Sequence, residues 1–132
     1  MPVSTPTVDV VIPVFNGERY LGEAIESVLA QDYKMASIIV VDDGSSDRSV
    51  DVARRFPGVV VLRQERRGPA AARNRGVESS SAELLAFLDA DDRWLPGKLR
   101  MQVEAIMTDD AVDMVFGGMN HFYSPELTPE EY

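Results

Sequence analysis

The chain has 132 residues, enough for one domain, and its 45% hydrophobic content is sufficient for a core, so intrinsic disorder is not expected. A formal charge of -9 argues against binding to nucleic acid or to an anionic membrane, and the absence of cysteine excludes disulfides and thiolate chemistry. The sequence has no signal-peptide pattern, and no apolar run approaches the roughly 20 residues of a membrane span. We therefore expect a cytoplasmic protein, either free or peripheral at the inner face of the membrane.

Strand-like and helix-like patterns alternate along the chain. Short apolar runs, the first of them rich in β-branched residues, predict strands at residues 8–13, 37–41, 59–62, 84–88 and 112–116. Helical spacing of apolar residues, or a proline in the first turn, predicts helices at 18–31, at 47–56, from Gly68-Pro69 onward and from Pro96 to 107. This alternation with short connections indicates an α/β fold, with a mostly parallel sheet and helices on both faces.

Polar residues gather where the predicted strands end. The four segments that follow the first four strands read PVFNGE, DDGSSD, RQERRG and DADD. In parallel sheets, ligands bind outside the carboxyl ends of the strands, near the point where the strand order reverses. We therefore expect the chemistry of this protein at that edge of the sheet.

Asp89 and Asp91 are separated by one residue on the turn that follows the fourth predicted strand. Two carboxylates at this spacing can share Mg²⁺ or Mn²⁺, which often use one or two carboxylates together with substrate phosphates. The alternative is an acidic turn in which Asp89 or Asp92 caps backbone N–H groups. Spacing alone leaves these two interpretations evenly balanced.

Asp43, after the second predicted strand, and Phe15, after the first, are candidate binding residues. A carboxylate at Asp43 can accept a hydrogen bond from a base or a ribose hydroxyl, and Phe15 can pack on a planar base. Helix capping by residues 45–47, and a core or capping role for residues 13–16, are the alternatives. Capping does not account for Asp43, because one helix needs only one N-cap.

Four arginines, at positions 66, 67, 73 and 75, surround a small-residue segment in an otherwise acidic chain. The guanidinium fork matches phosphate oxygens, and small residues allow a ligand to approach the backbone. For Arg66 and Arg75 an exposed basic face is the favoured interpretation.

Together these motifs resemble the family 2 glycosyltransferases with the GT-A fold. The resemblance covers about Val8 to Met107 and rests on PVFNGERYLGEAIESVLAQ, IIVVDDGSSD, GPAAARNRG, and LAFLDADD followed by WLPGKL. Each segment is a weak signal alone, but the four in this order are specific. The resemblance implies the Rossmann-like half of a GT-A fold, which binds a nucleoside-diphosphate sugar.

By that resemblance the donor is a nucleoside-diphosphate sugar, with a UDP-sugar the first expectation, bound through Mn²⁺ or Mg²⁺. Asp91 would coordinate the metal at the diphosphate, Asp89 would face the ribose or the metal, and Asp43 matches the carboxylate that recognises the base. The other implied donor-binding residues are Pro13 and Phe15 in the base pocket, Glu18 nearby, and Arg73 flanking the donor.

The chain departs from the family pattern because it lacks the second half, which binds the acceptor and supplies the catalytic base. We expect a donor-binding domain at residues 8–118, preceded by an N-terminal extension (1–7) and followed by a tail or truncated end (119–132). No residue of this chain is expected to be the catalytic base, and the inverting transfer typical of the family is not expected from it alone. The sequence does not indicate whether the acceptor is a glycan, a lipid or another molecule. Apolar surface left by a missing half favours a homo-oligomer.

Three other classes compete with this interpretation. A haloacid-dehalogenase-like phosphatase also has a D-x-D motif after a strand, but usually after the first strand and with Thr or Val following. A signalling receiver would need a lone aspartate after its third strand, where this chain has RQERR. A non-catalytic module that binds a nucleotide sugar remains open.

Overall fold

The computed structural model describes residues 5–122, which fall into two compact units divided after Arg100. No helix in this part of the chain is long and apolar enough to cross a membrane. The predicted boundaries of the donor-binding domain, 8 and 118, stay predictions, and most of the predicted tail at 119–132 lies outside the described residues.

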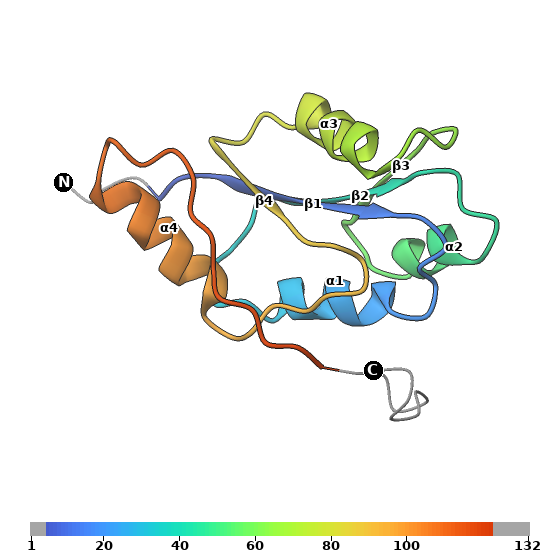
Figure 1. Ribbon diagram of the computed structural model, residues 1–132, viewed down its shortest axis with the longest axis horizontal. Coiled ribbons are helices and arrows are strands. Elements are labelled where there is room, and N and C mark those ends of the chain that lie inside the picture. The colour runs from blue at the N-terminus through green and yellow to red at the C-terminus, as the bar shows by residue number, and fades with distance from the viewer. Residues whose placement is uncertain (1–4, 123–132) are drawn as a thin grey trace. The chain divides into compact units, whose positions relative to one another are not determined.

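The first unit is built on a sheet of four parallel strands (Figure 1). The strands are β1 (Val8–Val14), β2 (Ser37–Asp42), β3 (Val60–Arg63) and β4 (Leu84–Phe87). Their order in the sheet is β3-β2-β1-β4. The chain therefore adds strands on one side of β1 and then returns to its other side, so the strand order reverses between β1 and β4.

The helices are α1 (Leu21–Leu29), α2 (Ser49–Arg54), α3 (Pro69–Ser79) and α4 (Lys98–Thr108). Helix α3 covers one face of the sheet, and α1 and α2 cover the other (Figure 1). All seven residues of β1 are buried because this central strand is covered on both faces. The predicted α/β class, with a parallel sheet and helices on both faces, is confirmed.

Helix α3 lies close to β1 because glycine faces the strand. A Cβ placed at Gly76 would overlap Cγ1 of Val11 and lie 3.0 Å from its Cγ2. Val11 belongs to a buried cluster with Ile39, Val41 and Ala72. The glycine therefore allows α3 to pack directly on the middle of the sheet.

The strand predicted at residues 112–116 is wrong, because this segment has no regular secondary structure. Its apolar residues produced the prediction, but Met114 and Phe116 are exposed, and no strand pairs with the segment within residues 5–122. A short apolar run becomes a strand only where a neighbouring strand accepts its backbone hydrogen bonds.

We expect Gly76→Ala to lower the free energy of unfolding by about 1–3 kcal/mol, because the added methyl group overpacks the buried Val11. Urea denaturation followed by circular dichroism measures the change. Gly22→Ala is the matched control, since a Cβ at Gly22 in α1 meets only Cγ1 of Val52 at 3.7 Å. That substitution should stabilise the protein slightly through helix propensity. Equal stability of the two variants would contradict the close approach of α3 to β1.

Candidate functional site

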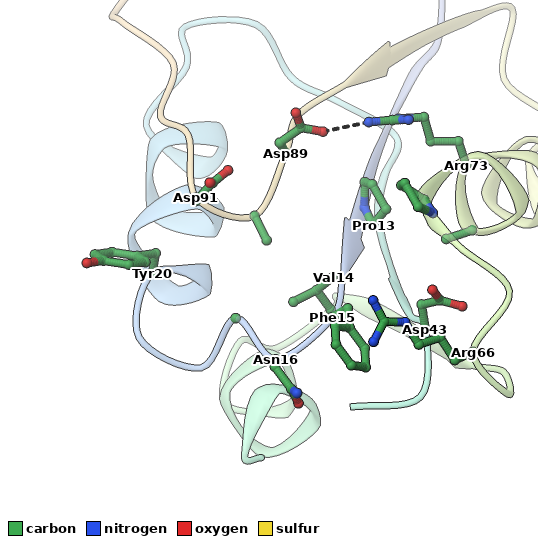
Figure 2. A pocket seen from close by; sticks show the side chains of 14 residues that line it. Pro13, Val14, Phe15, Asn16, Tyr20, Asp43, Arg66, Arg73, Asp89 and Asp91 are labelled. Atoms are coloured by element: carbon green, nitrogen blue, oxygen red, sulfur yellow. Dashed lines mark hydrogen bonds and ion pairs between the residues drawn. The ribbon is translucent and has the colours of Figure 1, made fainter. Parts of the chain in front are cut away.

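A cavity of about 550 Å³ opens at the carboxyl ends of the strands in the first unit (Figure 2). Its wall comes from the segments after β1, β2, β3 and β4 and from the first turns of α3. This is the edge where the sequence predicts the chemistry, at the reversal of strand order. Six of the seven predicted site residues line the cavity, namely Pro13, Phe15, Asp43, Arg73, Asp89 and Asp91.

Asp43 is the buried carboxylate of the cavity, with 3% of its surface exposed. Its Oδ1 accepts hydrogen bonds from Gln64 Nε2 at 2.9 Å and from the Arg67 backbone N–H at 2.8 Å, and its Oδ2 accepts one from the Gly68 N–H at 2.9 Å. Each carboxylate oxygen can accept two such bonds. Oδ2 therefore retains the capacity to accept one more donor.

Opposing effects act on the pKa of Asp43. Burial raises it, but the three hydrogen bonds and the positive charge of Arg66 outweigh the burial, so the pKa lies below its ordinary value. Asp43 is therefore ionised at neutral pH and presents a negative charge to a ligand that carries an N–H or O–H donor.

Arg66 stacks on Phe15 at the same end of the cavity. The central carbon of its guanidinium lies 3.4 Å from the centroid of the Phe15 ring, in a cation–π contact (Figure 2). Arg66 therefore already covers one face of the Phe15 ring. The expected packing of Phe15 on a base would need the other face of the ring or a displacement of Arg66. Arg66 is exposed, as the sequence favoured, but it also lines the cavity.

Asp89 and Arg73 form an ion pair across the cavity (Figure 2). Arg73 Nη2 donates to Asp89 Oδ1 at 2.9 Å, and both side chains are partly exposed. Exposed pairs of this kind contribute little to stability. The pair instead fixes the direction of one carboxylate oxygen, while Oδ2 of Asp89 remains available to a ligand.

The turn after β4 carries excess negative charge. Burial and the negative charges of Asp91 and Asp89 raise the pKa of Asp92. No group of three or more His, Cys, Asp or Glu side chains within residues 5–122 is arranged to hold a metal ion. A cation here would therefore need oxygen ligands from a bound molecule in addition to Asp91, and its charge would offset the repulsion within the turn.

Glu18, the seventh predicted residue, does not line the cavity. It belongs to a set of hydrogen bonds that joins the segment after β1 to the segment after β2: its backbone N–H donates to Asp47, and its carboxylate accepts from the Arg48 N–H. Glu18 therefore supports the two segments that form part of the cavity wall, without lining the cavity itself.

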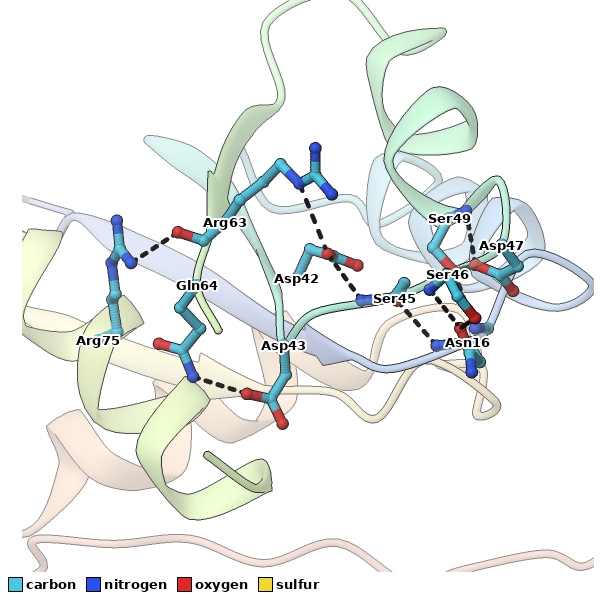
Figure 3. A network of polar contacts seen from close by, with 11 residues as sticks. Asn16, Asp42, Asp43, Ser45, Ser46, Asp47, Ser49, Arg63, Gln64 and Arg75 are labelled. Carbon is cyan, nitrogen blue, oxygen red and sulfur yellow. Dashed lines mark hydrogen bonds and ion pairs between the residues drawn. The ribbon is translucent and has the colours of Figure 1, made fainter. Parts of the chain in front are cut away.

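Asn16 and Ser45 complete this connection between the two segments (Figure 3). The Asn16 N–H donates to Ser45 Oγ at 2.8 Å, and Asn16 Oδ1 accepts from the Ser46 N–H at 2.9 Å. Asn16 has a φ of 49°, a left-handed conformation that asparagine tolerates better than most residues. Of the residues considered as helix caps, Asp47 accepts the N–H of Ser49, the first residue of α2, whereas Ser45 binds Asn16 instead.

Asp42, the other member of the aspartate pair, points away from the cavity because successive side chains of a strand face opposite sides. It is fully buried, and its Oδ2 accepts from the Ser45 N–H at 3.1 Å (Figure 3). Asp42 therefore supports the loop, whereas Asp43 faces the ligand side.

Sequence reasoning missed several lining residues. They are Asn16, Tyr20, Arg66, Pro69 and Ala90, among others. Asn16 and Ala90 lie within the quoted motifs, so their position at strand ends was a usable signal. Whether Tyr20 and Arg66 line the cavity depends on the direction of their side chains, which no spacing pattern in the sequence reveals.

The site can be compared with known proteins. Over 119 residues the chain is 40% identical to an uncharacterized glycosyltransferase of Nostoc sp., a match that covers 86% of this chain and 36% of the relative. The crystal structure of S. aureus TarS 1-349 in complex with UDP is similar with a TM-score of 0.71 and 26% identity, covering 77% of this chain and 32% of that one. The mannosyltransferase PcManGT from Pyrobaculum calidifontis, in complex with GDP-Man and Mn²⁺, is similar with a TM-score of 0.62 and 29% identity, covering 69% and 29%.

The chain spans about a third of the length of the Nostoc sp. relative and of two other curated relatives that it matches. Its four-stranded parallel sheet and its helices match the fold of GT-A glycosyltransferases. The sequence model for glycosyl transferase family 2 matches residues 9–130. This match covers nearly the whole sequence, so the chain belongs to glycosyl transferase family 2.

Proposed function

We propose that this chain binds the nucleoside-diphosphate sugar of a family 2 glycosyltransferase reaction, with a UDP-sugar as the first candidate. The observation that carries the proposal is the ionised, buried Asp43, whose Oδ2 can accept one further donor in the same cavity as Asp89 and Asp91. TarS with UDP and PcManGT with GDP-Man support a nucleotide sugar as the ligand of this fold.

The two ends of the cavity suit the two ends of such a donor. Asp43 and Phe15 lie after β2 and β1, where a base with an N–H group can donate to the carboxylate. The oxygens of Asp91 lie after β4, where a diphosphate would be brought together with a metal ion. Pro13, near the end of β1, lies between Asp43 and Asp91 in the view of Figure 2.

The residues of the turn after β4 fit a divalent metal. Asp91 would hold Mn²⁺ or Mg²⁺, and the cation would offset the negative charge that Asp89, Asp91 and Asp92 bring to this turn, where burial and then the charges of Asp91 and Asp89 raise the pKa of Asp92. Two carboxylates or fewer, completed by phosphate oxygens, are a common ligand set for such ions. When bound, the metal would act as a Lewis acid that stabilises the departing diphosphate. The PcManGT complex contains Mn²⁺, which supports a metal of this kind without distinguishing it from Mg²⁺.

Asp89 and Arg73 would hold the middle of the donor. With Oδ1 fixed by Arg73, Oδ2 of Asp89 can accept a hydrogen bond from a ribose hydroxyl. Arg73 would remain beside the donor as a positive charge near the phosphates. Glu18 acts at a distance in this proposal, by holding the segment that carries Phe15 and Asn16.

The overall reaction is proposed to invert the configuration at the anomeric carbon of the sugar. An acceptor hydroxyl would attack that carbon, the bond to the diphosphate oxygen would break, and the hydroxyl proton would pass to a base. The cavity carboxylates are not assigned that role, because Asp43 accepts three hydrogen bonds and Asp89 and Asp91 are assigned to the donor. The protein is further proposed to be cytoplasmic, either free or peripheral at the inner face of the membrane, and to form a homo-oligomer.

We expect isothermal titration calorimetry to show that UDP binds in the presence of Mn²⁺ and at least about tenfold more weakly in its absence, because two charged phosphates would otherwise meet the carboxylates after β4. Asp91→Ala should weaken binding in Mn²⁺ by a similar factor. Asp110→Ala is the control, since it removes the same charge from an exposed residue that does not line the cavity. UDP binding that depends on neither Mn²⁺ nor Asp91 would contradict the proposal.

We expect Asp43 to make the stability of the protein fall in acid. Because its pKa is lowered in the folded state, its contribution is present above the pKa of the unfolded chain and is lost as the pH falls through the folded pKa. Asp43→Asn places an amide against the N–H groups of Arg67 and Gly68 and should cost about 1–3 kcal/mol at neutral pH. Urea denaturation of both proteins from about pH 6 to about pH 3 measures the effect, and the difference between them should shrink at the acid end. A constant difference across this range would contradict the assignment.

A further inference from the structure

We propose that Ser27, in α1, and Gln31, just past its end, are positioning residues for the metal ion. They hold the segment at residues 93–99, which follows Asp89 and Asp91 directly, and so keep these two carboxylates in place before a metal binds. Neither Ser27 nor Gln31 lines the cavity, so both would act through the turn. The inference rests on the proposed function and adds to it residues outside the cavity.

A polar stripe on α1 carries the segment at residues 93–99. Glu23, Ser27 and Gln31 follow one another at intervals of four residues, so they lie along one side of the helix and of the turn that continues it. The buried residues of α1 occupy another side, and they are Leu21, Ala24, Ile25 and Val28. The helix can therefore pack on the core and bind a second segment at the same time.

Gln31 attaches the segment at two points. Its Nε2 donates to the Leu95 carbonyl at 3.0 Å and to the Ser27 carbonyl at 3.1 Å, and its Oε1 accepts from the Leu99 N–H at 3.0 Å. The reverse orientation of the amide would bring its oxygen against two carbonyl oxygens. Both ends of this one side chain are therefore used to hold backbone groups in fixed directions.

Ser27 attaches the segment closer to the carboxylates. The Trp94 N–H donates to Ser27 Oγ at 3.0 Å, and Ser27 Oγ donates to the Ala24 carbonyl at 2.7 Å. The side chain of Trp94 is buried, which adds packing to the hydrogen bond. Arg93 lies 3.9 Å from Glu23, but this ion pair is exposed and contributes little to stability. The firm attachment therefore begins at Trp94, three residues after Asp91.

The turn is held on its other side by the sheet. The Leu88 N–H donates to the Val11 carbonyl at 3.1 Å, so residues 89–93 lie between an attachment to β1 and one to α1. A Cβ placed at Gly17, just before α1, would lie 3.5 Å from the Cβ of Ala90, the residue between the two aspartates. In Figure 1 the chain after β4 then runs alongside α1 to the residues that Ser27 and Gln31 hold.

These attachments oppose the repulsion within the turn. Asp89, Asp91 and Asp92 carry like charges on neighbouring residues, and without a metal this repulsion favours a more open turn. Because the attachments order the turn during folding, a metal does not have to order it on binding. Loosening them should therefore weaken the metal, whereas a large excess of metal should restore the turn and with it the binding of the nucleotide.

The test is calorimetric titration of the 132-residue chain with UDP at a series of Mn²⁺ concentrations. Gln31→Ala should raise the Mn²⁺ concentration needed for half of the maximal UDP affinity by about tenfold, as losses of groups that orient metal ligands commonly do. At saturating Mn²⁺ its UDP affinity should approach that of wild type. Glu26→Ala is the matched control, because it truncates an exposed side chain of the same helix that does not line the cavity, and it should leave the Mn²⁺ requirement unchanged.

Trp94 provides a second measurement that needs neither metal nor nucleotide. It is the single tryptophan of the chain, so the intrinsic fluorescence reports on the attached segment directly. Acrylamide should quench this fluorescence more strongly in Gln31→Ala and in Ser27→Ala than in wild type, because the segment leaves α1 more often. Asp91→Ala should quench like wild type, since it removes a metal ligand and none of the attachments.

Two results would overturn the inference. One is an unchanged Mn²⁺ requirement in both Gln31→Ala and Ser27→Ala, and the other is a loss of UDP affinity that excess Mn²⁺ does not restore, which would mark a role in the fold alone. Either result, with wild-type UDP binding that depends on Mn²⁺ and Asp91, would leave the proposed function standing. Failure of wild type to bind UDP in Mn²⁺ would overturn both. Circular dichroism melting identifies any variant that does not fold, and Ser27→Ala, which loses fewer hydrogen bonds to the segment, then decides.

Discussion

The carboxylate of Asp43 is the interaction on which the arrangement of the site depends. It accepts hydrogen bonds from Gln64, just after β3, and from the backbone of Arg67 and Gly68, just before α3. One buried charge thereby connects the ends of β2 and β3 and the start of α3. Its burial is tolerated because three donors replace the water that it loses. The loop that carries Arg66 and the helix that carries Arg73 are both placed by these bonds.

The sheet topology supplies the second requirement, since it brings β4 beside β1 and so places the carboxylates after β4 opposite the residues after β1. Glycine at position 76 lets α3 lie close enough to this pair of strands for its first turns to form part of the cavity wall. The hydrogen bonds between Asn16 and Ser45–Ser46 then hold the remaining wall. Backbone packing and polar connections thus act together on the same cavity.

Much of the fold and part of the site could be predicted from the sequence. Apolar periodicity located four of the five proposed strands, and polar residues at strand ends pointed to the edge of the sheet where the cavity opens. The prediction failed for residues 112–116, because an apolar run does not reveal whether a neighbouring strand exists. It missed Arg66 as a lining residue because the direction of a long side chain depends on Phe15, which is distant in sequence. The resemblance implies that Glu18 lies near the donor, which stays a prediction, and the structure adds that Glu18 joins the segments after β1 and β2 by hydrogen bonds.

The pairing of β4 with β1 also has a consequence for the order in which the protein assembles. The Glu83 N–H, just before β4, donates to the Thr7 hydroxyl 76 residues earlier. Contacts between such distant segments close large loops and form slowly. The chain can pair β1, β2 and β3 while it is still being synthesised, but Asp89 and Asp91 reach the cavity only after β4 has docked. During synthesis, ligand recognition would therefore be acquired in the last step of folding of this unit, and a ligand that bridges Asp43 and Asp91 would stabilise that step more than any earlier one.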